Sequence, residues 1–511
     1  MGTIIIPGFK GGIANSLLDP LSKQTYQTAK GLDIFSLPNI LRSHYAIDND
    51  ITDKTLNNIK LNSYYKGSDG NNYFKGFDEA GGTVLTIWDA GSAGLGSITS
   101  LTAETTAAGN VATHGMVEFL ANLWYWQTAS VLARFDFSTI TSNVLTAINS
   151  IAPIFVHRGL AKMFYTVSNY QIGGSLTTSP AATVLLTFDN ADRVVQMAEY
   201  QRWVAVAVNN VNASSSSKIA IWDGSSTTLD DLIDLGDIGI QTMVNVNGVL
   251  YVLTSTNPHG WGAKSLIRIY KVVGSRVKLV KELDLQATTT GGVSINTAAV
   301  AVLAGKIYFG INASSATTIM TIDNGVYAYD TEQDILTLDR ITSDTTAINI
   351  TSVGFNGGAM VVTWYDGTNY KMSHVNSSPG VSSLGVYQSN AFPLNNGKMG
   401  KVKRILILHK NMAASCGFTA KIKHFGHYPT SGSVESADGF ANLLTPQGNA
   451  ATSGFSQSTD DAGYTIIENL HQFKEARFTQ LEIAFDEVSG LNSAEILFPI
   501  FMDTADGSDR I

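Results

Sequence analysis

The sequence predicts an all-β protein, with a six- or seven-bladed β-propeller over residues 51–385 followed by a jelly-roll-like antiparallel β-sandwich over residues 386–511. Three observations predict this fold. Short runs rich in Val, Ile, Tyr, Trp and Thr alternate with Gly, Asn, Ser and Asp, which is typical of strands joined by tight turns. An apolar segment that ends in an aromatic residue and Asp recurs along the chain, and a second strand pattern precedes several of its copies.

The recurring segment is interpreted as the third strand of each blade. Its aromatic residue is suited to packing between sheets, and its Asp opens the next turn by bonding to nearby backbone. The copies end 34 to 59 residues apart. They are residues 85–89, 132–136, 185–189, 219–223, the variant 267–271, and 326–330.

The second pattern is a turn followed by a strand rich in aromatic and branched residues. Asn247-Gly248 is its clearest turn, because both central positions of a type I′ hairpin need a positive φ. The pattern occurs at residues 121–126, 201–206, 247–252, 304–309 and 356–362, and fourth strands are predicted at 277–283 and 335–339.

Four strands in about 40 to 50 residues make one propeller blade, and a ring of blades buries the faces that a lone blade would expose. The predicted blades cover residues 51–100, 112–140, 145–190, 193–236, 238–286, 292–342 and 346–380. A β-sandwich without radial order is the alternative that this pattern leaves open, because neither a WD repeat signature nor a kelch motif recurs.

The two ends of the chain have different patterns. Residues 1–50 are interrupted by Gly and Pro, and we expect an arm that packs on the propeller or on a neighbouring subunit. At the other end, strands are predicted at residues 401–409, 418–424, 477–485 and 496–501, with a long polar interaction loop over 430–461.

Composition excludes several classes of protein. The 511 residues are 44% hydrophobic, so the chain buries a sizeable core and is not disordered. A net charge of −9 gives no basic footprint for nucleic acid, and no apolar run is long enough to span a membrane. The N-terminus has no signal-peptide pattern, and a single cysteine, Cys416, favours folding in a reducing compartment.

Motifs for catalysis, cofactors and metals are not found, so we predict no catalytic, cofactor-binding or metal-binding residue. His424 and His427 stand three apart on a predicted strand, where their side chains point to opposite faces. Cys416 has no neighbouring group that would activate its thiol, and a buried, inert thiol is expected.

One segment is a candidate binding loop. His259 and Trp261 lie between two predicted strands of one blade, so we expect them in an exposed loop. Trp261 has the chemistry to stack on a sugar ring or to anchor a protein contact. The alternative is that Trp261 folds back over the edge of the blade.

The chain resembles propeller-bearing virion proteins of tailed bacteriophages. The resemblance rests on an early Gly11-Gly12-Ile13, on irregular blades with IWD- or TFD-type endings, and on a sandwich that begins with residues 391–394 and 401–404. It implies a non-catalytic structural component of a tail tip, baseplate or neck, made in the host cytoplasm and built into the virion. Its implied partners are other virion proteins in a symmetric homo-oligomeric assembly and a host-surface glycan.

Two other functions stay open at this stage. One is a propeller glycan hydrolase or lyase acting on host-envelope polysaccharide, a chemistry that needs two carboxylates across a pocket. The nearest approach to a sialidase turn, residues 458–465, occurs once and outside the predicted propeller. The other is a cytosolic bacterial scaffold protein.

Overall fold

The computed structural model divides the chain into two compact units, and it is all-β, as predicted. Unit 1 comprises Met1–Ala46, Gln333–Ser343 and Ser378–Ile511, and unit 2 comprises Ile47–Glu332 and Asp344–Ser377. The described residues contain no α-helix, and none of their segments forms a helix that could cross a membrane. The structure describes residues 2–9, 11–13, 25–37, 39–44, 47, 59–78, 84–89, 99–104, 115–128, 131–145, 153–211, 216–256, 266–284, 292–313, 325–341, 349–366, 370–374, 385–410, 416–427, 436–437, 441–442, 463–468, 475–487 and 494–506.

Unit 2 contains, within its described residues, five four-stranded antiparallel sheets whose strands follow chain order. They are β6–β9 (Ile59–Lys66, Asn72–Asp78, Val84–Asp89, Thr99–Glu104), β10–β13 (Val117–Phe119, Asn122–Thr128, Val131–Phe135, Ile140–Leu145), β14–β17 (Ile154–His157, Lys162–Ser168, Gln171–Ser175, Val184–Thr187), β18–β21 (Asp192–Tyr200, Trp203–Asn210, Lys218–Trp222, Asp231–Asp234) and β22–β25 (Ile240–Val246, Val249–Thr256, Leu266–Val273, Arg276–Asp284).

Two further strand groups complete unit 2. One consists of the antiparallel strands β27 (Val300–Leu303), β28 (Lys306–Gly310) and β30 (Gly325–Asp330). The other is the five-stranded sheet of β26 (Val293–Ser294), β29 (Asn312–Ala313), β32 (Asn349–Asn356), β33 (Ala359–Tyr365) and β34 (Tyr370–His374), with the 3₁₀ turn Thr297–Ala299 between β26 and β27.

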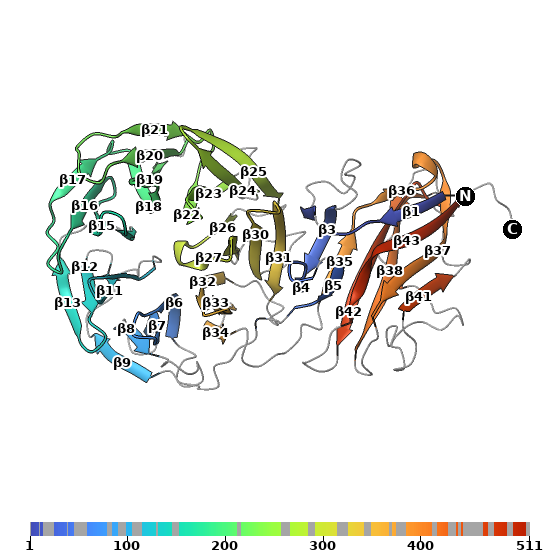
Figure 1. The fold of residues 1–511 in the computed structure, drawn as a ribbon, viewed down its shortest axis with the longest axis horizontal. Coiled ribbons are helices and arrows are strands. Elements are labelled where there is room, and N and C mark those ends of the chain that lie inside the picture. The colour runs from blue at the N-terminus through green and yellow to red at the C-terminus, as the bar shows by residue number, and fades with distance from the viewer. Residues whose placement is uncertain are drawn as a thin grey trace. The chain divides into compact units, whose positions relative to one another are not determined.

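These groups form a closed ring (Figure 1). The first strands of successive groups contact one another from β10 through β14, β18, β22 and β27 to β32, and β32 also contacts β6. The remaining junction is closed by a buried cluster that joins Tyr73 on β7 to Leu123, Tyr125 and Phe135 of the next sheet. A ring of radially arranged antiparallel sheets is a β-propeller.

The predicted roles of the aromatic-plus-Asp segment are confirmed at residues 219–223. Trp222 is fully buried in a cluster with Phe164, which belongs to the preceding sheet. The side chain of Asp223 accepts hydrogen bonds of 2.7 Å from the backbone N–H groups of both Ser225 and Ser226, which fixes the turn to the next strand. The turn at Asn247-Gly248 has the predicted positive φ values, 51° and 84°.

One copy of the segment occupies a different place from the one predicted. Residues 185–189 fall on and just after β17, the fourth strand of their sheet, and the third strand is β16. β16 contains Gly173 and Gly174, and a Cβ added at Gly173 would lie 2.8 Å from the Tyr165 ring. Packing therefore requires glycine in β16. Because of these glycines, β16 lacks the apolar run by which the third strand of a blade is recognised in the sequence.

Unit 1 contains two groups of strands around one hydrophobic core. The first has the order β4 (Leu32–Asp33), β5 (Ile40–Ser43), β43 (Ile496–Asp506), β37 (Gly400–His409) and β41 (Gly463–Glu468), with β1 (Gly2–Ile6) beside β43. The second has the order β31 (Ile335–Ile341), β3 (Thr25–Lys30), β35 (Val386–Ser389), β42 (Phe478–Glu487) and β38 (Cys416–His427), together with β2 (Gly12–Ile13), β36 (Phe392–Pro393), β39 (Ser436–Ala437) and β40 (Ala441–Asn442).

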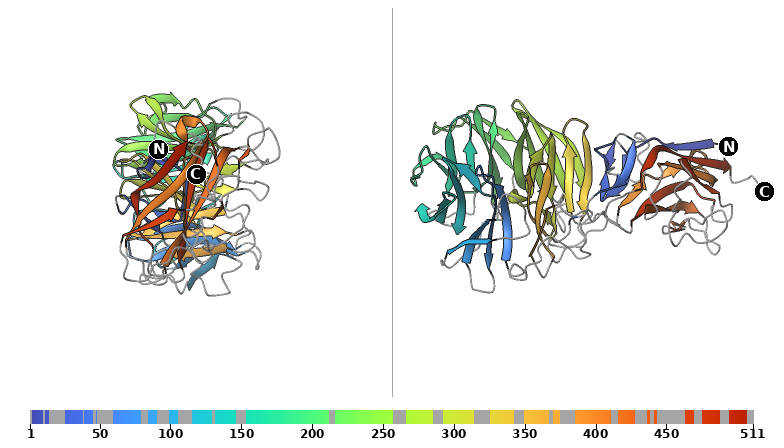
Figure 2. Two further views of the ribbon diagram at one scale, coloured as in Figure 1. Left: turned by 90° about the vertical axis from the view of Figure 1, so that its right-hand side faces the viewer. Right: turned by 60° about the horizontal axis from the view of Figure 1, so that its bottom comes forward.

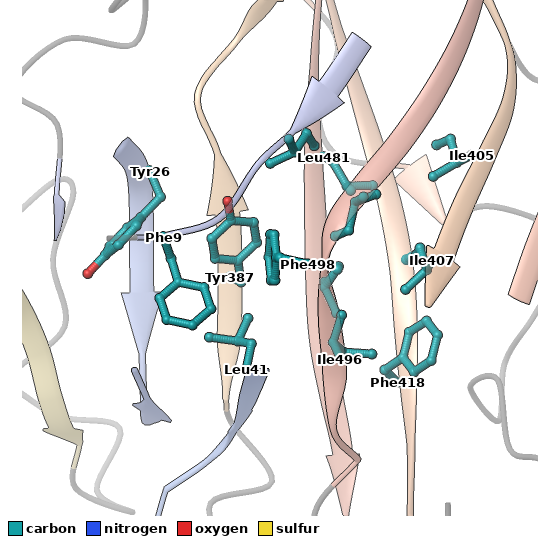
Figure 3. Packing of buried hydrophobic residues seen from close by; sticks show 14 of the residues in the cluster. Phe9, Tyr26, Leu41, Tyr387, Ile405, Ile407, Phe418, Leu481, Ile496 and Phe498 are labelled. Carbon is teal, nitrogen blue, oxygen red and sulfur yellow. The ribbon is translucent and has the colours of Figure 1, made fainter. Parts of the chain in front are cut away.

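The core of unit 1 draws side chains from both groups of strands. Ile405 and Ile407 of β37 share a cluster with Phe418 of β38 and Leu481 of β42. Figure 3 shows these side chains with Phe9, Tyr387 and Phe498, whose rings meet edge to face. All four strands predicted over residues 401–501 lie in these two groups, whereas the predicted loop 430–461 falls mostly outside the described residues.

The structure groups residues 1–46, most of the arm predicted over 1–50, with unit 1. β1 pairs antiparallel with β43, β5 pairs with the same strand, and β3 pairs with β35, so these residues are built into the sheets of unit 1 (Figures 1 and 2). Residues 333–343, predicted as part of a blade, also group with unit 1, where β31 runs parallel to β3. Buried apolar side chains such as Ile6 and Tyr26 explain why the N-terminal segment folds into this core.

Candidate binding site

A pocket of about 260 Å³ lies in unit 2 among strands of three sheets. It is formed by the beginnings of the first strands β18 and β22, the end of β19, and the segment that contains β26 and the turn after it. Its lining residues are Arg193, Val194, Val195, Asn209, Ile240, Gln241, Ser294, Ile295, Asn296 and Thr297.

Three amide side chains hold the walls of this pocket together. Asn209 donates to the carbonyl of Ile240 at 2.9 Å and accepts from the N–H of the same residue at 3.0 Å, which joins β19 to β22. Gln241 accepts from the N–H of Ile295 at 3.4 Å, and Asn296 donates to the carbonyl of Ile350 at 3.2 Å. These bonds fix the lining segments, so the pocket is largely pre-formed.

Arg193 is the one lining residue that carries a formal charge. Its side chain is exposed, and the described residues provide it with no ion pair and no side-chain hydrogen bond. A guanidinium presents five N–H donors in a planar fork and stays protonated at all ordinary pH values. The donors of Arg193 are therefore available to a ligand.

The lining residues restrict what the pocket can do chemically. Asp, Glu, His, Lys and Cys do not occur among them. General acid–base catalysis and the two-carboxylate chemistry of glycosidases need such groups within reach of the substrate. The described lining residues supply neither kind of group.

Two buried polar side chains elsewhere in unit 2, Asp237 and His157, make hydrogen bonds within the fold. Asp237 accepts hydrogen bonds from Thr254 and Tyr270, each at 3.0 Å. His157 is buried, with the N–H of Leu160 donating to its Nδ1 at 3.2 Å and its Nε2 3.2 Å from the carbonyl oxygen of Trp203. These interactions tie loops to strands.

None of the residues singled out in the sequence is among the described residues that line this pocket. His259 and Trp261 lie outside the described residues, so their predicted loop stays a prediction. His424 is buried on β38, and Cys416 is the first residue of that strand. In the described part of the chain, no group of three or more His, Cys, Asp or Glu residues could hold a metal ion.

Sequence reasoning missed the pocket because its residues are spread over about 100 positions and come from five elements. No short motif joins them, and only the ring brings β18, β22 and the β26 segment together. Arg193 carries no distinctive signal in the sequence, because its strand, DRVVQMAEY, also contains Asp192 and Glu199.

Comparisons with known proteins give a likeness in architecture only. No protein-family model matches the sequence, and no curated protein matches it either. Among solved structures, the Neurospora crassa Pan2 WD40 domain shares 8% identity, covers 62% of this chain and 90% of its own, and gives a TM-score of 0.41. The WD40 β-propeller domain of Doa1 shares 10% identity over 62% of this chain and 96% of its own, with a TM-score of 0.39.

An exo-β-1,3-galactanase from Phanerochaete chrysosporium is also similar, at 10% identity over 91% of this chain and 100% of its own, with a TM-score of 0.33. At TM-scores this low, none of the three likenesses carries an argument about this chain.

Proposed function

We propose that the protein is a non-catalytic structural component of a tailed-bacteriophage particle, placed in the tail tip, baseplate or neck. One observation carries the proposal: in each unit, a strand from the early part of the chain contacts a strand from the late part. β1 pairs with β43 in unit 1, and β32 packs against β6 in unit 2. Closure of this kind holds both units stiff, which suits a platform for contacts with other subunits.

The finer architecture forms part of the proposal. We interpret unit 2 as a seven-bladed propeller, with the five four-stranded sheets, the β27–β28–β30 group and the β32–β33–β34 sheet as its blades. Unit 1 is interpreted as a β-sandwich, because strands from its two groups share one core.

The proposed mechanism is binding through repeated weak contacts. In a symmetric homo-oligomer, each contact with another virion protein or with a host-surface glycan recurs in every subunit, so the overall avidity exceeds the affinity of one contact. Only 15% of the residues are charged, which suits a surface that is partly covered by neighbouring subunits. The pocket supports binding over catalysis, because its described lining has no acid–base pair.

Immunogold labelling of phage particles that carry the gene tests this proposal. Label at one fixed position on intact particles is the expected result, and protein that remains in the particle-free fraction would overturn the assignment. A second assay incubates the purified chain with host-envelope polysaccharide. Binding without release of reducing ends is expected, whereas release that grows with time would identify an enzyme instead.

A further inference from the structure

The geometry of the pocket on β18 and β22 points to a binding site for a sugar acid, a monosaccharide-sized ligand whose carboxylate pairs with Arg193. The inference specifies the glycan-binding part of the proposed function. It rests on the pocket alone, so it can succeed or fail whether or not the protein belongs to a particle.

The charge of the site selects an anion. Arg193 contributes a positive charge, and the described lining contains no carboxylate to neutralise it or to repel an anionic ligand. This contrasts with the net charge of −9 on the whole chain. Guanidinium and carboxylate groups are planar and match each other in two parallel hydrogen bonds, which are stronger than bonds between neutral groups.

The size of the site selects a small ligand. Sites for drug-sized molecules usually occupy about 300 to 1,000 Å³, so a pocket of about 260 Å³ is suited to one sugar ring rather than to a long oligosaccharide. A longer glycan would then bind through one terminal or branching acidic residue.

The remaining polar groups suit the hydroxyl groups of a sugar. Ser294 is exposed at the pocket, and the amides of Gln241 and Asn296 are held in place by their bonds to the backbone. An amide oxygen has two lone pairs and an amide nitrogen has two hydrogens, so a group that already makes one bond to the protein can make another to a ligand. The apolar side chains of Val195 and Ile240 supply walls for the face of the ring.

Titration of the full chain with single compounds tests the inference, using ligand-observed NMR and calorimetry. The panel contains glucuronate, galacturonate and N-acetylneuraminate, with neutral glucose and inorganic phosphate as comparisons. We expect at least one sugar acid to bind at least tenfold more tightly than glucose, because glucose lacks the group that pairs with Arg193.

Variants assign the binding to the pocket. Arg193→Gln is expected to lower the affinity for the sugar acid to that for glucose, and Arg193→Lys to restore part of it, because lysine keeps the charge but not the fork. Arg202→Gln is the matched control. Arg202 is exposed on the turn that follows β18, and its guanidinium carbon lies 4.5 Å from the centre of the Trp203 ring. Arg202 does not line the pocket, so the affinity of Arg202→Gln for the sugar acid should not change.

Three results would overturn the inference. They are no binding of any sugar acid in the panel, binding that Arg193→Gln leaves unchanged, and binding of phosphate as tight as that of the sugar acid, since the last would reveal a general anion site. Thermal unfolding of each variant confirms folding, which we expect to be retained because Arg193 is exposed and unpaired among the described residues.

Discussion

The carboxylate of Asp237 and the phenol of Tyr270 are joined by a hydrogen bond of 3.0 Å inside unit 2. Asp237 lies in the connection between β21 and β22, and Tyr270 lies on β24, so the bond fastens the link between two sheets to the interior of the second. Burial raises the pKa of Tyr270 to about 12, and the charge of Asp237 adds to the effect. The phenol therefore remains a donor at any ordinary pH.

Replacing this carboxylate should destabilise unit 2. In Asp237→Ala, Tyr270 and Thr254 lose their 3.0 Å acceptor, and Arg268 loses a contact of 3.4 Å. Leaving the donors of Tyr270 and Thr254 without a partner should cost about 2 to 3 kcal/mol. The cost is no larger because Arg268, the charged partner, is partly exposed. Urea unfolding measures the loss. The control Asp230→Ala, at an exposed position, should stay within about 0.5 kcal/mol, and an equal loss in both variants would contradict the role of the network.

Closure of the ring depends on glycine at position 354, which lets the ring of Tyr64 approach the backbone closely. Gly354 lies on β32, and a Cβ there would come within 2.2 Å of the Tyr64 ring on β6. Gly354→Ala should therefore cost about 1 to 3 kcal/mol through overpacking. Gly358→Ala is the matched control, since a Cβ at Gly358 would meet nothing within 4 Å.

A second substitution identifies the cause of that loss. In a Tyr64→Ala background the clash is removed, so adding Gly354→Ala should cost much less than it does in the native chain. Additive losses in the double variant would show that the ring of Tyr64 is not what excludes the methyl group. Thermal unfolding of the four chains completes the cycle.

The N-terminal segment should be essential to the stability of unit 1. Phe9 is 1% exposed, and its ring centre lies 5.3 Å from that of Phe498 in an edge-to-face contact. Phe9→Ala should cost about 3 to 5 kcal/mol through the cavity that it leaves. Ile5→Ala, at a side chain that is 45% exposed, should cost far less in the same denaturant titration. A small loss for Phe9→Ala would mean that the segment is dispensable.

The stability of unit 1 should fall in mildly acidic solution because of His44. Burial holds the pKa of His44 well below its usual 6.5, and the neighbouring Arg340 lowers it further while Asp33 opposes. Below the unfolded pKa, the unfolded chain binds a proton that the folded chain resists, so the free energy of unfolding decreases as the pH drops from about 7 to 5. Denaturant titrations across this range should show the decrease. In His44→Gln, the free energy of unfolding should fall less over the same pH range.

A second decrease is expected at lower pH from Asp33. Burial by itself would raise the pKa of this carboxyl, but the interaction with His44 and the bonds from Arg42 and Ser36 lower it from 3.8 to about 2. Its stabilising effect is complete above 3.8 and disappears as the pH falls through about 2. Asp33→Asn should be less stable near neutral pH and should lack this acid transition. An unchanged transition in the variant would assign it to another group.

The recurring strand segments were readable from the sequence because their causes are local. An alternating apolar run, an Asp that bonds to the two following N–H groups, and an Asn-Gly turn with positive φ each need only neighbouring residues. The same local pattern could not place residues 185–189 correctly. The third strand of that sheet contains Gly173, which is needed because it leaves space for the ring of Tyr165. That requirement comes from tertiary packing, and no local sequence pattern reveals it.

Strand period and turn chemistry are short-range properties, so local patterns were enough to predict an all-β chain of short, turn-linked strands with buried aromatic residues. The folded chain alone reveals that β1 pairs with a strand some 500 residues away, that β32 meets β6, and that Arg193 and Asn296 line one pocket. The physical reason is that these contacts join segments far apart in the chain, and their free energy comes from burial and pairing that no local pattern encodes.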